Sequence, residues 1–529
     1  MTSTPRSFAA VLAAVATLGL ANAAFAITAT WTGGTGNWTD PAGWSFDTAP
    51  TSVTYPDNDL TDRFDVFVDA GAPQAATVSL GTTATVVTLG ISNGDAVEIA
   101  DGGFLQFRGS IADVGPAGTI DNQGVLRLAD GPTGARIYSD GDISLSGNGV
   151  LDLGTRGNNT IELFGDFTNG ADHTIRGAGT ITAPMDFLNF GQVESIPFTH
   201  LAIQASPPGP FAAIGQYENQ GTIRARSNSL LTFRGILASS GDIDVESGAR
   251  LSVRNLEVNG PPDAGRIEID GTLVGTDIEN RGSIGLSSGG QLLVSRQIRN
   301  LGSIEMENGA DVEAGRFIQT GADAETILGT ALILGGGIAS LLIDDGTLVL
   351  ENGRVEMPFS SQIKAVIFRE GASLVGSGEI DTDVTQTAEF LGRLSPGESG
   401  TGEITFTSDL MFGATSRIEI ELGGSPSAEE HDLVSILGTT FLDGEVVLEL
   451  LDGFAPEMGD SFDVLLSSMI EDAGHALMAP DLAGGLYWRS MIVDTDDGQA
   501  LRVQVIPEPS TTLLLGLGLV GLGGLRSRA

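Results

Sequence analysis

The residue types best suited to chemistry are few and widely spaced in this chain. It contains no cysteine, which excludes a thiol nucleophile and a cysteine-based metal site. Its four histidines, His173, His200, His431 and His475, form no H-E-x-x-H motif and no close pair, so the sequence predicts no zinc hydrolase. We expect all four to be ordinary turn or surface residues. No G-x-S-x-G elbow or phosphate-binding loop is present.

Acidic residues dominate the charge, with 68 aspartates and glutamates against 26 lysines and arginines. Such a surface repels nucleic acid and anionic lipid, so neither is an expected partner. Clusters of Asp and Glu arise by chance at this content, and none identifies an active site. The sequence therefore predicts no enzyme and no cofactor. The alternative is a polysaccharide lyase or hydrolase on a β-helix, which a contiguous groove of Asp, Glu and Arg would favour.

Two acidic turns are loosely similar to calcium loops. One contains Asp57, Asn58, Asp59 and Asp62, and the other covers residues 494–498. Neither has the D-x-D-x-D-G spacing with a distal glutamate that a calcium loop requires. We expect both to be solvated acidic turns.

Three features follow one another in the last 24 residues. A Pro-Glu-Pro triplet predicts a stiff, extended spacer, because proline fixes φ and disfavours helix at the residue before it. Residues 511–525 carry no charge and predict a short hydrophobic helix, too short to cross a bilayer core of roughly 30 Å comfortably. A basic tip follows, where positive charge favours the cytoplasmic side. The residues that define this segment are Pro507, Glu508, Pro509, Arg526 and Arg528.

This order of triplet, apolar run and basic tip resembles the PEP-CTERM sorting signal of Gram-negative bacteria. The resemblance covers residues 506–529. It implies export, a precursor held in the inner membrane through residues 511–525, and processing near the triplet by a membrane protease of the exosortase type. The protein would then be found at the cell surface or outside the cell.

The opposite end of the chain also predicts export. Residues 1–26 have the layout of a secretory signal peptide, with Arg6, an apolar stretch, and small residues at Ala24 and Ala26. Removing both ends takes away three arginines and one glutamate, so 26 basic and 68 acidic residues become 23 and 67. An exported protein without disulfides must be held by a large apolar core or by regular backbone pairing.

A short unit repeats between roughly residues 75 and 355: Asn or a small polar residue, any residue, Gly, any residue, then Ile, Leu or Val. Clear copies begin at Asn122, Asn219, Asn280 and Asn300. Successive glycines are 20, 24, 17 and 20 residues apart at Gly221, Gly241, Gly265, Gly282 and Gly302. After many copies, apolar and polar residues alternate.

Alternation at period two predicts half-buried strands, and Asn-x-Gly is turn chemistry. Units of about 20 residues without helical stretches indicate coils that stack on one another. We therefore predict an all-β fold, a right-handed parallel β-helix with Ile, Leu and Val inside. The Asn side chains should form turn hydrogen bonds or a ladder. Because the spacing is irregular, a pair of antiparallel sandwiches remains the alternative.

The ends of such a solenoid need caps. Trp31, Trp38 and Trp44 cluster near the N-terminus, in a phrase that resembles the opening of bacterial autotransporter passenger repeats. We expect them to plug the first coil; a platform for stacking sugars is the alternative. Farther along, a series of phrases between Leu394 and Leu465 is similar to the C-terminal part of autotransporter-like and PEP-CTERM β-solenoid proteins.

These features divide the chain into five segments. They are a signal peptide (1–26), a Trp-rich cap (27–74), β-solenoid repeats (75–390), an autotransporter-like β region (391–505) and the sorting signal (506–529). The resemblance implies a surface or matrix protein with a structural or adhesive role, associated with exopolysaccharide in a biofilm. An extracellular polysaccharide is the partner that this role implies.

Overall fold

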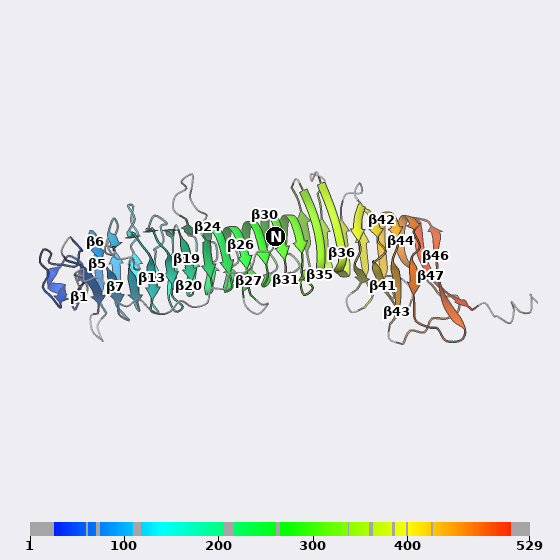
Figure 1. Cartoon of the computed structure of the whole chain (residues 1–529), viewed down its shortest axis with the longest axis horizontal. Coiled ribbons are helices and arrows are strands. Elements are labelled where there is room, and N and C mark those ends of the chain that lie inside the picture. The colour runs from blue at the N-terminus through cyan, green and yellow to red at the C-terminus, as the bar shows by residue number, and fades with distance from the viewer. Residues whose placement is uncertain are drawn as a thin grey trace, which may run out of the picture.

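The computed structural model describes residues 26–508, except 60–61, 70–74, 109–117, 184, 206–215, 261–264, 337, 359–362, 383–386, 398–399, 425–426 and 452. The described chain is all-β, apart from one 3-10 turn (η1, Pro41–Gly43). Its strands stack into an elongated rod, with β1 (Ile27–Trp31) at one end and β46 (Leu486–Thr495) and β47 (Gly498–Pro507) at the other (Figure 1). The predicted signal peptide lies outside the described residues, save for Ala26.

Three faces make up the rod, and each coil contributes a strand to every face. On the first face β1 pairs in parallel with β4, β4 with β7, and so on along the rod. The strands that belong to this face alone are β1, β4 (Phe64–Val68), β7 (Thr88–Ile91), β10 (Thr119–Asn122), β13 (Ile143–Ser146), β16 (Phe167–Asn169), β19 (Asp186–Asn189), β22 (Gln216–Asn219), β37 (Thr387–Phe390) and β40 (Asp409–Phe412).

The second face follows the Asn-x-Gly corner of each coil. Its strands are β2 (Gly36–Asn37), β5 (Thr77–Leu80), β8 (Ala96–Ile99), β11 (Val125–Leu128), β14 (Val150–Asp152), β17 (Thr174–Gly177), β20 (Gln192–Ser195), β23 (Thr222–Ala225), β25 (Asp242–Val245), β27 (Arg266–Ile269), β29 (Ser283–Leu286), β31 (Ser303–Met306), β33 (Glu325–Leu328), β38 (Arg393–Pro396), β41 (Arg417–Leu422), β43 (Glu445–Leu450) and β45 (Ala476–Met478).

The third face completes each coil. Its separate strands are β6 (Thr83–Val86), β9 (Phe104–Phe107), β12 (Arg136–Ser139), β15 (Thr160–Leu163), β18 (Gly179–Thr182), β21 (His200–Gln204), β34 (Ala331–Leu334) and β39 (Glu403–Phe406). Longer strands bend around the corner from the third face to the first: β24 (Leu230–Ser239), β26 (Arg250–Val258), β28 (Thr272–Asn280), β30 (Gln291–Asn300), β32 (Asp311–Gln319), β42 (Leu433–Leu442) and β44 (Ser461–Asp472). Two strands run along all three faces, β35 (Ile338–Glu356) and β36 (Ile363–Asp381).

This parallel stacking is typical of a β-solenoid and excludes the pair of antiparallel sandwiches. The glycine spacing sets the step between coils, because Thr222 pairs with Asp242, 20 residues on, and Arg266 with Ser283, 17 residues on. The parallel pairing also continues past residue 391 as far as β45.

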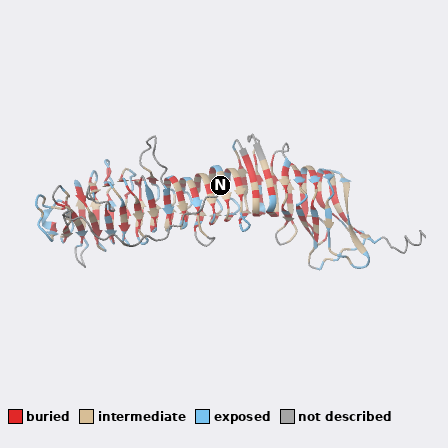
Figure 2. Cartoon of the chain, in the orientation of Figure 1, coloured by how far each residue is buried: buried red, intermediate tan, exposed pale blue. Residues whose placement is uncertain are grey.

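The core fills the space between the three faces, as predicted from the alternating pattern. In β23, Ile223 and Ala225 are fully buried, whereas Thr222 and Arg224 lie partly exposed. Buried and less buried residues alternate in this way along the whole rod (Figure 2). Aromatic side chains also pack against one another inside it: Phe167, Phe187, Tyr217 and Phe233 follow one another in tilted or edge-to-face contacts, with ring centroids 5.5 to 6.5 Å apart. Such contacts stabilise the fold beyond the area that they bury.

The repeat asparagines form a buried ladder at the corner between the first and second faces, as expected. The Asn169 amide donates to the Asn189 carbonyl oxygen at 2.8 Å, and Asn189 donates to Asn219 at 2.7 Å. Asn219 then donates to the hydroxyl of Ser239 at 2.9 Å. All four residues are buried. The apolar Val258 occupies the next ladder position and interrupts the ladder. A second ladder begins at Asn280, whose amide donates to the carbonyl oxygen of Asn300 at 2.9 Å, so its buried polar groups are paired as well.

The glycine of each unit lies where one coil's backbone closely approaches the next. A Cβ at Gly221 would lie 2.0 Å from the carbonyl oxygen of Gly191, and one at Gly241 would lie 2.1 Å from that of Gly221. Real Cβ atoms do not approach backbone oxygens this closely, so only glycine fits. The spacing of Asn and Gly that recurs from unit to unit thus has two separate causes, a buried amide and a close backbone contact.

Antiparallel strand pairs close both ends of the rod, whereas the strands of its middle pair in parallel. At the N-terminal end, β3 (Trp44–Phe46) pairs antiparallel with β1. Trp31, Trp38 and Trp44 are buried there, with ring centroids 5.0 and 5.1 Å apart in edge-to-face contacts. Each indole N–H donates to a backbone carbonyl. These tryptophans plug the first coil as expected, and none of the three has an indole face free to stack on a sugar.

At the C-terminal end the pairing changes direction. β47 pairs antiparallel with β44 of the last coil on one side and with β46 on the other. β47 also contributes core residues, since Leu501, Val503 and Val505 are fully buried. The antiparallel hairpin of β46 and β47 therefore closes the third face of the rod.

Candidate functional site

The predicted sorting residues begin inside the last strand of the rod. Pro507 is the final residue of β47 and pairs with Leu486 of β46. The backbone N–H of Glu508 donates to the carbonyl of Gly485 at 2.8 Å. Both Pro507 and Glu508 are exposed. Pro509, residues 511–525, Arg526 and Arg528 lie outside the described residues.

Both edges of β47 are occupied up to Val505. On the side of β46 the pairing runs from Gly498 to Pro507. On the side of β44 it runs from Gln499 to Gln504, and Val505 continues it with hydrogen bonds to Gly459 and Asp460 at 3.0 and 2.9 Å. Beyond Val505 only the β46 side is paired in the part of the chain that the structure describes. From Ile506 to Glu508 the backbone is therefore hydrogen-bonded along one edge instead of two.

The base of the hairpin is packed around Trp488. Its indole N–H donates to the carbonyl of Pro480 at 3.1 Å, and its ring lies 6.2 Å from that of Phe462. A surface hollow of about 370 Å³ opens beside it and is lined also by Leu477 and Glu508. An ion pair between Arg502 and Asp463, at 2.6 Å, further ties β47 to β44; its hydrogen bond raises the pKa of Arg502, and the charge of Asp463 adds to the effect.

Comparison with known protein families identifies this segment. Residues 505–528 match the PEP-CTERM protein-sorting motif. The chain carries a PEP-CTERM sorting motif. This motif confirms the predicted sorting signal and implies exosortase-dependent export of a surface protein. No curated protein matches the chain.

The PEP-CTERM motif thus overlaps the fold by four residues, 505–508, a feature that the sequence pattern alone did not show. Among residues that the structure describes, no helix is long and apolar enough to cross a membrane. The hydrophobic helix predicted for 511–525 falls beyond them and stays a prediction.

The acidic turn near the N-terminus serves to cover a strand edge. The Asp57 carboxylate accepts from the N–H of Thr85 on β6 at 2.9 Å, and the N–H of Asn58 donates to the Thr85 carbonyl at 2.7 Å. The Asp62 carboxylate accepts from Thr51 and Ser52. Within the described ranges, no cluster of three or more His, Asp and Glu side chains is arranged to hold a metal ion.

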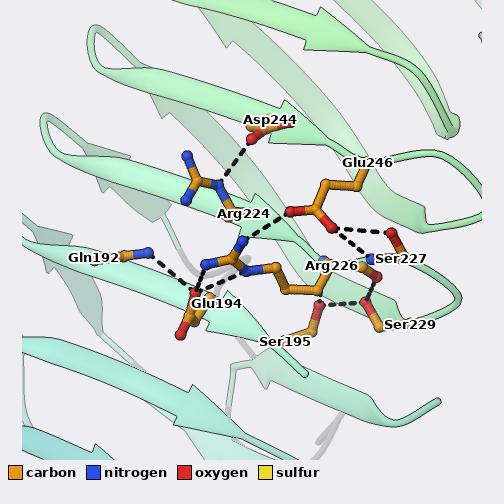
Figure 3. Close-up of polar contacts among 9 residues, drawn as sticks. All are labelled: Gln192, Glu194, Ser195, Arg224, Arg226, Ser227, Ser229, Asp244 and Glu246. Atoms are coloured by element: carbon orange, nitrogen blue, oxygen red, sulfur yellow. Dashed lines mark hydrogen bonds and ion pairs between the residues drawn. The ribbon is translucent and has the colours of Figure 1, made fainter. Parts of the chain in front are cut away.

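A network of ion pairs and hydrogen bonds joins three coils on the second face (Figure 3). Arg226 donates to Glu194 of the coil before it at 2.8 Å and to Glu246 of the coil after it at 2.9 Å. Burial alone would raise the pKa of Glu246, but hydrogen bonds from Ser227 and Arg226 outweigh it and lower the pKa. A carboxylate held ionised in this way suits an ion pair between neighbouring coils rather than general acid catalysis.

Farther along the same face lies a polar groove of about 410 Å³. It is lined by residues of β27, β29 and β31, among them Arg266, Glu268 and Glu305, and by Glu307 directly after β31. Gly285, which has no side chain, leaves the floor of the groove open. Arg266 and Glu268 form an ion pair. This groove brings Arg and Glu residues together, as the alternative enzymatic interpretation requires.

Two of the four histidines, expected to be turn or surface residues, follow turns directly but are buried. His173 is fully buried between the asparagines: its Nδ1 lies 2.9 Å from Asn169 Oδ1, and its Nε2 lies 3.1 Å from Asn122 Nδ2. Nδ1 must donate and Nε2 must accept, so the ring is neutral. Burial lowers the pKa of His173 to about 4. The amide ladder needs a group that can both donate and accept at this position, and neutral imidazole meets that need.

The other buried histidine precedes a buried carboxyl group. His431 donates from Nδ1 to the carbonyl of Gly424 at 2.9 Å. Asp432 is fully buried and accepts from the N–H groups of Gly402 and Glu421 at 2.8 and 2.7 Å. Burial raises the pKa of Asp432 to about 7, and the charge of Glu421 adds to the shift. The sequence signal was a polar pair directly before the apolar start of β42, which the search for catalytic motifs missed.

Proposed function

We propose that this protein is a rod delivered to the cell surface, where it acts as a structural or adhesive component of an exopolysaccharide matrix. The observation that carries the proposal is the continuity of a PEP-CTERM motif with the last strand of a long coil stack. The sorting motif supplies delivery, and the stack supplies long faces of repeated polar side chains. The acidic surface favours neutral or cationic polymers as partners, because like charges repel.

Binding to matrix polysaccharide tests this role directly. Purified protein, residues 27–508, would be sedimented with exopolysaccharide isolated from the producing cells. We expect the rod to sediment with the polymer and to remain in the supernatant without it. A rod that stays in the supernatant at all polymer concentrations would contradict the adhesive role.

We further propose that the parallel coils wind with a right-handed sense and that residues 511–525 form the precursor's membrane anchor. Parallel strands of one sheet are almost always joined by right-handed connections, which supports the hand. The uncharged run and the basic tip support the anchor. An experimental structure of the rod, and membrane extraction of the unprocessed precursor, would test the two points separately.

A second candidate function, favoured by the groove near Arg266, is cleavage of a polysaccharide. In this function Arg266 would bind an acidic sugar, and Glu268 or Glu305 would transfer a proton. Purified protein would be incubated with matrix polysaccharide, and new reducing ends would be measured. Activity that is lost in Glu268→Gln and in Glu305→Gln but kept in Glu313→Gln, which changes an exposed glutamate on another face, would support the enzyme.

A further inference from the structure

We propose that the processing protease cuts C-terminal to Glu508, so that the mature protein keeps the whole of β47 and the first two residues of the triplet. This inference rests on the proposed surface delivery and adds the position of the cut. It follows from the pairing and burial of residues 498–508, the last four of which also belong to the sorting motif.

The first argument concerns access. Proteases commonly bind the segment to be cut as an extended strand, through its backbone N–H and C=O groups. Up to Val505 those groups are already engaged on both sides, by β46 and by β44 with its neighbouring loop. The N–H of Glu508 is also engaged, by Gly485. A cut before Glu508 would therefore require the hairpin to open first.

The second argument concerns the stability of the product. Leu501, Val503 and Val505 are fully buried, and Arg502 pairs with Asp463. Losing these residues would expose the paired edge of β44 and the apolar side chains beneath it. An exposed strand edge promotes association between chains. A cut beyond Glu508 instead leaves the closed end of the rod intact.

The experiment is the intact mass and C-terminal peptide of the protein recovered from the producing cells. We expect a mature chain that ends at Glu508 or shortly beyond it and lacks residues 511–529. A processed chain that ends before Glu508 would overturn this inference while keeping the proposed surface sorting. A chain that retains residues 511–529 would instead overturn the processing on which both depend.

Two truncated chains test the structural argument independently of the protease. One ends at Glu508 and the other at Asp497, just before β47. We expect the first to unfold at the temperature of the full-length protein, whereas the second should unfold at least several degrees lower and self-associate. Equal melting temperatures and equal monomer fractions in size-exclusion chromatography would show that β47 is dispensable, which would remove the second argument.

Discussion

Single buried polar side chains link neighbouring coils through hydrogen bonds. Asn189 has partners above and below, because it accepts from Asn169 and donates to Asn219. Without the Asn189 amide the Asn219 carbonyl oxygen loses its donor, whereas the Asn169 amide keeps its hydrogen bonds to the carbonyls of His173 and Gln192. An unsatisfied buried polar group costs about 1–3 kcal/mol.

Asn189→Ala should therefore destabilise the rod by about 1–3 kcal/mol, because the substitution leaves the buried Asn219 carbonyl oxygen without its donor. Urea unfolding followed by circular dichroism measures the change. Asn308→Ala is the matched control, since Asn308 lies exposed in a turn and its loss should cost less than about 0.5 kcal/mol. Equal effects of the two substitutions would show that the ladder contributes nothing.

His173 should make the rod sensitive to acid. Its pKa is lowered to about 4 in the fold, against 6.5 for the free side chain, so the unfolded chain binds the extra proton more readily. The contribution of neutral His173 to the free energy of unfolding is complete above pH 6.5. It is lost as the pH falls towards 4, and the loss amounts to about 3 kcal/mol in all. His173→Gln should lower stability at pH 7 but flatten its decline between pH 6.5 and 4. The exposed His200→Gln should alter that slope much less; an unchanged slope in His173→Gln would contradict the prediction.

At the scale of the coil, the corner is the element that tolerates least change. The sequence predicted this corner well: the Asn-x-Gly spacing fixed the step of each coil, and the alternation after it fixed which residues face inward. The same local pattern could not reveal the antiparallel pairing of β44 with β47. That pairing joins segments about 40 residues apart through ordinary alternating sequence, with no special residue at the contact.

Gly241→Ala should destabilise the rod by more than about 2 kcal/mol, because the new methyl group would meet the carbonyl oxygen of Gly221. Thermal unfolding of the purified variant measures the effect. Gly81→Ala provides the comparison, as a Cβ there meets nothing within 4 Å and φ is not positive. If Gly241→Ala melts together with Gly81→Ala, close packing at the corner does not explain the repeat.

Taken as a whole, the rod combines a uniform middle with two specialised ends. The middle was predictable because each coil repeats the same local chemistry. The ends were less so: the tryptophan plug was expected from its composition, but the buried Asp432 was not, because burial of a carboxyl group depends on loops that the repeat does not encode. The overlap of the sorting motif with β47 required the structure for the same reason.

His173 and Asp432, both fully buried, should give different parts of the rod opposite responses to pH. Asp432 has a pKa of about 7 in the fold, above its ordinary 3.8, so its stabilisation is full below 3.8 and is lost as the pH rises through 7. His173 responds in the opposite sense. Hydrogen exchange measured by mass spectrometry, corrected for intrinsic rates, should show weaker protection around His173 and stronger protection around Asp432 at pH 4.5 than at pH 7. A parallel change in both regions would contradict this prediction.

The position of β47 also decides how mechanical force enters the molecule. While the tail is tethered, any pull on it reaches the rod at Glu508, the end of a strand bonded along both edges. A pull along the strand would load these transverse hydrogen bonds together, in shear, whereas a pull across it would break them one after another. The force needed to detach β47 from the rod would then depend on the angle between the strand and the direction of the pull.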